Sequence, residues 1–253
     1  MRSLAEAARF LAHAFAPLRC TGCDDAGDAP ICARCLDALD RLALPPASRL
    51  PGGALIAAFE YRDPLRGIIH RVKYRSARSA LGVVASFAAA RLTQHHELAG
   101  DGIVAVPLGP RRLRQRGYNQ AEAIAGPLAT LTSMPVRAGL VRVRDTAAQA
   151  EIDAAARWRN VEDAFTWCGP PLSGLRLWLV DDVVTTGATV SAASAALLAA
   201  GAAEVGVVAL AAVPSSSART YDRFEWHRTS DSSPRLGGRG GAGDHRRAAP
   251  RTG

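Results

Sequence analysis

The sequence predicts an α/β domain with a mostly parallel sheet that is flanked by helices. Apolar runs with the length of strands alternate with stretches of helical periodicity, and several of those runs are apolar throughout. Continuous apolar runs are typical of strands covered on both faces, as parallel strands are. Hydrophobic residues make up 48% of the 253 residues, which is enough for a packed core.

Residues 1–50 are expected to form a separate small module that precedes this domain. It would contain a short helix, a cysteine cluster and a second helix near residues 36–42. Charged residues inside the first apolar stretch favour an amphipathic helix over a signal peptide. Residues 43–53, ALPPASRLPGG, have the composition of a linker.

The main domain is assigned to residues 51–213, with strands and helices in alternation. A strand at 54–61 leads to a helix opened by Asp63-Pro64, and a second helix covers about 79–98. The remaining elements are strands at 102–107, near 136–143, at 175–182 and at 203–213, and helices at about 119–131 and 189–201. Residues 145–160 are either a mobile loop or a weak helix.

The charge of the chain is concentrated in its last segment. The net charge is +8, and residues 215–253 hold eight arginines against four acidic residues. Residues 214–253 lack periodicity and are expected to be a disordered basic tail. The rest of the chain is only mildly basic, so nucleic-acid binding is allowed but not required. No apolar run is long enough to cross a membrane, and a cytoplasmic protein is expected.

The segment LVDDVVTTGAT, residues 179–189, is the strongest functional signal. A strand ends in Asp181 and Asp182, a tight turn follows, and a helix begins. Ligands of open α/β sheets bind beyond the carboxyl ends of strands, and the N–H groups of a turn and a helix N-terminus bind anions. Gly187 would let a phosphate approach the backbone closely. The carboxylates would bind sugar hydroxyls or share a Mg²⁺. The acid pair and the phosphate-binding turn together predict a sugar-phosphate site. The alternative is an ordinary helix start capped by Asp182 or Thr185.

An arginine-rich loop follows the strand at 102–107. Arg111, Arg112, Arg114 and Arg116 lie within six residues. Arginine binds phosphate oxygens with two N–H groups at once, so this loop could recognise a pyrophosphate, with Arg116 and Arg114 as candidates. The alternatives are a solvated basic loop or a nucleic-acid contact.

At these residues the chain resembles the type I phosphoribosyltransferases and, more closely, the ComF/GntX family. The motifs are HRVKY (70–74), VPL (106–108), RGYNQ (116–120), RxRxTxxQ (142–149), RxxN (157–160) and VDDVVTTGAT (180–189), in matching order over about residues 54–212. The resemblance implies that Asp181 and Asp182 lie near the ribose hydroxyls of phosphoribosyl pyrophosphate, bound with Mg²⁺. It implies that Val184, Thr185, Thr186, Gly187, Ala188 and Thr189 surround the 5′-phosphate, and that residues 144–160 form a hood. Lys73 is a candidate to reach the pyrophosphate or, equally, a solvated helix lysine.

Four of the five cysteines form two CxxC pairs, Cys20 with Cys23 and Cys32 with Cys35. Two such pairs at short spacing predict a structural Zn²⁺ bound by four thiolates, and the alternative is reduced thiols or a redox pair. The family often carries a two-part zinc ribbon, of which this chain has the cysteines for one part. Cys168 is expected to be a packing residue.

Three functions remain open from the sequence. The first is an enzyme that transfers the phosphoribosyl group of phosphoribosyl pyrophosphate to a nitrogen acceptor. The second is a non-catalytic competence factor that acts in DNA uptake with a DNA-translocation partner, as the ComF name implies. The third is a zinc-ribbon nucleic-acid binder, which the scarcity of aromatic residues disfavours. The acceptor and the oligomeric state are not encoded in any motif.

Overall fold

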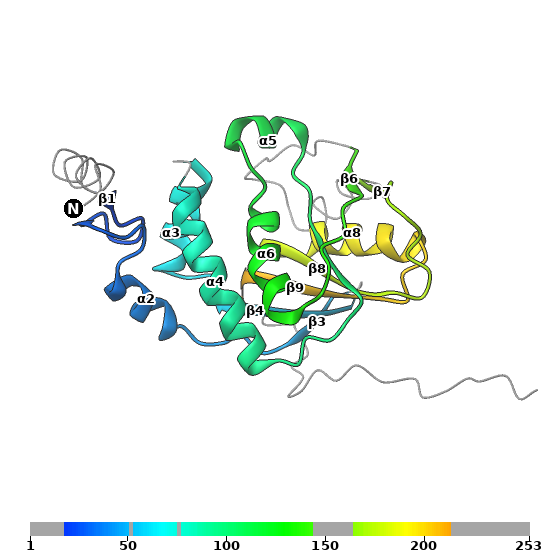
Figure 1. The fold of residues 1–253 in the computed structure, drawn as a ribbon, viewed down its shortest axis with the longest axis horizontal. Coiled ribbons are helices and arrows are strands. Elements are labelled where there is room, and N and C mark those ends of the chain that lie inside the picture. Colours follow the sequence, from blue (N-terminus) through cyan, green and yellow to red (C-terminus); the bar gives the residue numbers. More distant parts are fainter. Residues whose placement is uncertain (1–17, 51–52, 75–76, 144–163, 214–253) are drawn as a thin grey trace, which may run out of the picture.

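A computed structural model describes residues 18–50, 53–74, 77–143 and 164–213 of the chain. Its centre is a five-stranded sheet in the order β3-β4-β9-β8-β5 (Figure 1). The strands are β3 (Ser48–Leu50), β4 (Gly53–Glu60), β9 (Glu204–Ala212), β8 (Arg176–Val184) and β5 (Gly102–Ala105). β4, β9, β8 and β5 are parallel, and β3 is antiparallel to β4. The predicted mostly parallel sheet is confirmed.

Helices cover both faces of this sheet because its central strands are apolar on both sides. Side chains of successive strand residues point to opposite faces. Trp178, Val180, Val208 and Leu210 pack on one side, with α3 (Leu65–Tyr74), α4 (Arg78–His95) and α6 (Gln120–Thr132). Leu177, Leu179, Val207 and Ala209 pack on the other, with α8 (Ala188–Ala199). The predicted helices flanking the sheet are confirmed.

The small module lies at the start of the described chain. It consists of a two-stranded sheet, formed by β1 (Leu18–Arg19) and β2 (Ala26–Gly27), and of the helix α2 (Ala33–Asp40). Figure 1 shows it beside α3 and one end of α4. Cys20, Ile31 and Leu39 are buried in the same apolar cluster as α3 and α4, so the module is packed onto the main domain rather than separated from it.

Three local predictions were wrong. Residues 48–50, read as linker, form β3, because the neighbouring edge of β4 offers them backbone hydrogen bonds. The arginine-rich loop contains a helix, α5 (Pro110–Arg116), which begins with proline and ends at the left-handed Gly117. The strand expected near 136–143 is reduced to a bridge at Val136 and to β6 (Leu140–Arg142), which pairs with β7 (Phe165–Trp167) outside the main sheet.

Several predictions concern residues outside the described part of the chain. These are the first helix of the module, the hood at 144–160 with the RxxN motif and residues 144–149 of RxRxTxxQ, and the tail at 214–253. Cys168 is described and is exposed, so its expected packing role is wrong. The described residues include no helix that is both long and apolar enough to cross a membrane.

Candidate functional site

The acid pair stands on a part of β8 that projects beyond its neighbour β5. β5 pairs with β8 only as far as Val180, whereas β8 continues to Val184 alongside β9. The strand therefore does not end at the carboxylates, as the sequence suggested, but carries them past the end of β5 while it stays paired with β9. Asp181 and Asp182 stand at this carboxyl edge, where open α/β sheets bind ligands.

The two carboxyl groups have different surroundings. Asp181 lines a small pocket with residues 183–190, whereas Asp182 forms an ion pair with Lys73, whose Nζ lies 2.5 Å from Asp182 Oδ2. Neighbouring side chains of a strand point to opposite sides, which accounts for this division. Lys73 was predicted to reach a pyrophosphate or to be solvated; in the structure it is largely buried against Asp182.

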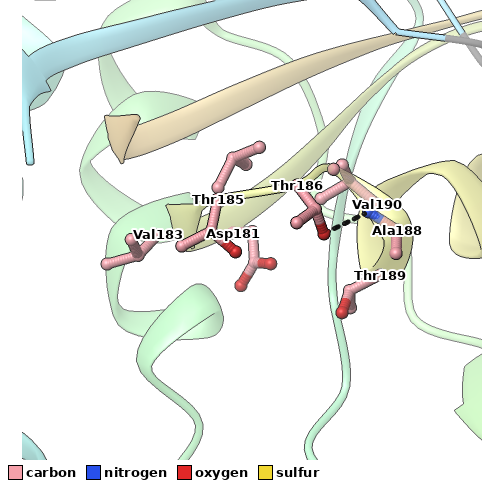
Figure 2. A pocket seen from close by; sticks show the side chains of 9 residues that line it. Asp181, Val183, Thr185, Thr186, Ala188, Thr189 and Val190 are labelled. Carbon is pink, nitrogen blue, oxygen red and sulfur yellow. Dashed lines mark hydrogen bonds between the residues drawn. The ribbon is translucent and has the colours of Figure 1, made fainter. Parts of the chain in front are cut away.

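The pocket beside Asp181 is small, is open to solvent on one side, and is lined by the end of β8, the turn after it and the start of α8. Figure 2 shows Thr185, Thr186 and Thr189 around the Asp181 carboxyl group. Gly187 has φ 79° and ψ −3° and is the N-cap of α8, so the helix begins at a left-handed residue. A Cβ at Gly187 would lie 2.6 Å from Leu50 Cδ2 of β3, which shows how closely β3 covers the turn.

The first N–H groups of α8 are not capped by the side chain of the N-cap residue, since Gly187 has none. Asp182 and Thr185, the alternative caps, do not hold that position. The Thr186 hydroxyl lies 3.5 Å from the Ala188 nitrogen, which is at most a weak hydrogen bond. The arrangement therefore leaves backbone donors of the helix start next to three threonine hydroxyls, a combination that suits a phosphate.

Asp181 is the most perturbed acid of the site. Burial, and then the neighbouring Asp182 carboxylate, raise the pKa of Asp181 to about 7, although the Asp182 N–H, Lys73 and Arg142 act in the opposite direction. A carboxyl group with a pKa near neutrality in a cleft is a common property of functional sites. Arg142 of β6, which lies over the Phe165 ring at 5.3 Å, is the first residue of the RxRxTxxQ motif, but the sequence analysis did not propose it as a site residue.

The RGYNQ segment contacts the helix that carries Lys73, the partner of Asp182. The Tyr118 hydroxyl donates to the Val72 carbonyl at 3.2 Å, next to Lys73. The Arg78 guanidinium lies 4.5 Å from the Tyr118 ring centroid and donates to the Gly117 carbonyl. Asn119 caps α6, since its Oδ1 accepts from the Ala121 N–H at 3.1 Å. The motif thus fixes α6 and the end of α3 in place.

The arginines of α5 do not line the pocket. Arg116 donates to Gln120 Oε1 at 3.1 Å and is partly buried, whereas Arg111 and Arg114 are exposed. Figure 1 shows α5 projecting from the body of the domain. Arg114 is therefore not among the residues that line the pocket at β8, and Arg116 is held by Gln120 within the RGYNQ segment.

The four clustered cysteines could hold a metal ion such as zinc. All four Sγ atoms lie within 4.8 Å of one another, and Cys23 Sγ and Cys32 Sγ are 3.7 Å apart. Zn–S bonds of about 2.3 Å in a tetrahedron place sulfur atoms about 3.8 Å apart, so this spacing fits zinc. The predicted grouping of Cys20, Cys23, Cys32 and Cys35 is confirmed.

Backbone donors favour a thiolate at this cluster. Cys20 Sγ accepts hydrogen bonds from the N–H groups of Gly22 (3.3 Å) and Cys32 (3.2 Å). Burial raises the pKa of the Cys20 thiol, but these and a further backbone hydrogen bond outweigh burial and lower the pKa to about 6. Metals bind the thiolate, so the donor set fits a structural metal.

Comparison with known proteins identifies the family. The chain is 37% identical over 183 residues to DNA utilization protein YhgH of Escherichia coli K12, which covers 70% of this chain and 75% of the relative. It is 34% identical over 181 residues to YhgH of Salmonella typhi, with the same coverage. It is 32% identical over 158 residues to competence protein F of Haemophilus influenzae, covering 60% of this chain and 69% of the relative. The chain belongs to the ComF family. No protein-family model matches it.

Solved structures that resemble this ComF protein include an amidotransferase and a phosphoribosyltransferase. Glutamine phosphoribosylpyrophosphate amidotransferase from B. subtilis is 23% identical, with a TM-score of 0.37 and coverage of 53% of this chain and 26% of that one. Orotate phosphoribosyltransferase from Mycobacterium tuberculosis is 17% identical, with a TM-score of 0.33 and coverage of 70% and 81%. These scores are low, and the family assignment of the ComF chain rests on its sequence relatives.

Proposed function

We propose that this ComF protein binds phosphoribosyl pyrophosphate with Mg²⁺ at the edge of β8. The supporting observation is the pocket in which Asp181 faces the uncapped start of α8 and the hydroxyls of Thr185, Thr186 and Thr189. A phosphate would accept hydrogen bonds from the turn and the helix start. Asp181 would accept hydrogen bonds from the ribose hydroxyls, with Asp182 beside it.

The bound sugar could then be transferred to a nitrogen nucleophile. In that reaction the bond between C1 of the ribose and pyrophosphate breaks, the leaving group keeps the electron pair, and a C1–N bond forms while the nitrogen loses a proton. Mg²⁺ would neutralise part of the pyrophosphate charge. The protein would chiefly hold the reactants in line. Lys73 of α3 and Arg116, the first residue of the RGYNQ segment, are the cations that we propose to face the leaving group.

Calorimetry tests the binding. We expect saturable binding of phosphoribosyl pyrophosphate in the presence of Mg²⁺ and its loss in the Asp181→Asn/Asp182→Asn variant, because amides accept hydrogen bonds from hydroxyl groups less strongly than carboxylates. Glu97→Gln, which changes an exposed acid, is the matched control and should bind as the wild type does. A folded, metal-loaded wild type without binding would refute the proposal. Transfer of the phosphoribosyl group is then tested by measuring pyrophosphate release in the presence of each member of a panel of amines and bases.

A second candidate is a binding role in DNA uptake without catalysis. The exposed Arg111 and Arg114 of α5 support it, since within the described residues neither forms an ion pair with an acidic side chain. So do the names of the relatives, DNA utilization protein and competence protein F. This function predicts ligand binding without turnover, together with binding to DNA or to a DNA-translocation partner. If α5 contacts single-stranded DNA, Arg111→Gln/Arg114→Gln should lower the salt dependence of log K by about 0.7 per lost phosphate contact.

A further inference from the structure

Three consecutive residues of α3 contact three separate parts of the molecule. Arg71 donates to the carbonyl groups of Thr21 and Gly22, which lie between Cys20 and Cys23. The carbonyl of Val72 accepts from the Tyr118 hydroxyl at 3.2 Å. Lys73 Nζ lies 2.5 Å from Asp182 Oδ2. One turn of helix therefore joins the cysteine cluster, the RGYNQ segment and the acid pair.

The helix is suited to transmit a displacement between these parts. Residues two positions apart in a helix point about 200° from each other, so Arg71 and Lys73 leave α3 on opposite sides. Val72 between them is 2% exposed, and packed interiors resist local deformation. A shift of the backbone that Arg71 holds would therefore move the lysine that faces Asp182.

The carbonyl groups bound by Arg71 depend on the closure of the cysteine cluster. Gly22 donates its N–H to Cys20 Sγ at 3.3 Å, and a Cβ at Gly22 would lie 2.5 Å from Cys35 Sγ. The peptide groups at Thr21 and Gly22 thus pack directly on the sulfur atoms. Loss of the metal would leave the thiolates unbound. The carbonyl groups of Thr21 and Gly22 would then lose their fixed orientation.

A second arginine also attaches the module but does not approach the acid pair. Arg91 of α4 donates to the carbonyl groups of Asp40 at 2.9 Å and Leu42 at 2.6 Å, at the far end of α2. Arg71 and Arg91 therefore each donate to two carbonyl groups of the module, and Arg91 in addition forms an ion pair with Asp40 at 3.3 Å. Only Arg71 stands on the helix turn that carries Lys73, which makes Arg91 a matched control.

We propose that Arg71 is a positioning residue that links the metal-loaded cysteine cluster to the acid pair through Lys73. In the loaded protein, Arg71 holds α3 so that Lys73 stays on Asp182, and the pocket next to it is kept ready for its ligand. The affinity part of this inference rests on the proposed binding of phosphoribosyl pyrophosphate. The structural part, a link between the metal and residues 181–184, does not.

Calorimetry with phosphoribosyl pyrophosphate and Mg²⁺ tests the affinity part on the full metal-loaded chain. We expect Arg71→Gln to weaken binding about three- to tenfold, a size usual for residues that act at a distance. Arg91→Gln should change it less than about twofold. In a Lys73→Gln background, Arg71→Gln should cause no further loss, because the link is already broken. Equal losses for Arg71→Gln and Arg91→Gln, or additive losses with Lys73→Gln, would overturn the proposal.

Amide hydrogen exchange tests the structural part without any ligand. Chelation of the metal should speed exchange in α3 and in residues 181–184 of the wild type, and Arg71→Gln should already show the faster rates at 181–184 before chelation. Unchanged exchange at 181–184 after chelation would overturn the link. Where Arg71→Gln does not fold, Arg71→Lys retains the charge but cannot bind both carbonyls, and it should show the same effect more weakly. A wild type that binds no phosphoribosyl pyrophosphate, yet shows the exchange changes, would refute the proposed function and support the link.

Discussion

Lys73 Nζ lies 2.5 Å from Asp182 Oδ2, and the two side chains are only 20% and 15% exposed. The pair joins α3 to β8 at the edge of the pocket. A largely buried ion pair costs desolvation when it forms, so its net contribution to stability is small. Removal of one partner is more harmful than the pair is beneficial, since it leaves a charge without compensation.

We expect Lys73→Gln to lower the free energy of unfolding by about 1–2 kcal/mol, less than for a fully buried pair because both groups retain some contact with water. Denaturant titration measures this change. In Lys73→Gln/Asp182→Asn the uncompensated charge is gone, so part of the loss should be recovered. Strictly additive losses in the two single variants and the double variant would mean that the ion pair does not couple the residues.

Asp181 should make stability depend on pH. Its pKa is raised from 3.8 to about 7, so between these values the folded chain binds more protons at this group than the unfolded chain. The stabilisation is complete below about pH 4 and is lost as the pH rises through 7. Asp181→Asn stays neutral and should therefore gain stability over the wild type, on the order of 1 kcal/mol, at pH 8 but not at pH 4. Thermal unfolding at both pH values measures the difference, and an equal effect at both would contradict the assignment.

Gly187 is expected to be essential for the turn. Gly187→Ala would place a Cβ on a residue with φ 79° and 2.6 Å from Leu50 Cδ2. The left-handed conformation alone costs about 1–2 kcal/mol for a residue with a Cβ. Gly174→Ala is the matched control, since Gly174 has φ 76° and no atom within 4 Å of a new Cβ.

Both glycine variants should lose about 1–2 kcal/mol of stability from backbone strain. Only Gly187→Ala should also lose affinity for phosphoribosyl pyrophosphate, because the turn must open to accommodate the methyl group. Chemical denaturation and calorimetry separate the two effects. Wild-type affinity in a folded Gly187→Ala protein would show that the turn is not the phosphate site.

Patterns of local sequence were enough to predict the central sheet and its helices. The apolar runs of β4, β8 and β9 and the helical spacing of the apolar residues in α3 follow from burial on one or both faces, which the sequence displays directly. β3 could not be predicted, since three residues among prolines and glycines form a strand only when β4 offers its edge. We predicted a loop at α5 because this arginine-rich segment has no apolar face. Pro110 and Gly117 are nevertheless good helix boundaries.

The sequence was enough to propose which residues form the candidate site, but not which residues they contact. Spacing brought the four cysteines together correctly, since two CxxC pairs have few ways to fold around one metal. Spacing could not indicate that Asp181 and Asp182 face different surroundings, which depends on β8 continuing to Val184. Nor could it indicate Arg71, whose partners Thr21 and Gly22 lie about fifty residues earlier in the chain. Such contacts depend on tertiary packing.

The cysteine cluster supplies the last prediction. Cys32→Ser should remove bound zinc, since Cys32 Sγ lies 3.7 Å from Cys23 Sγ inside the cluster and a serine hydroxyl is a poor zinc ligand. Cys168→Ser, which changes an exposed cysteine outside the cluster, should retain one zinc per chain. Elemental analysis of the purified proteins measures the metal, and thermal unfolding should show a lower melting temperature only for Cys32→Ser. Because the cysteines pack in one apolar cluster with α3 and α4, loss of the metal should also loosen the main domain. Stoichiometric zinc in folded Cys32→Ser would show that the metal is held elsewhere.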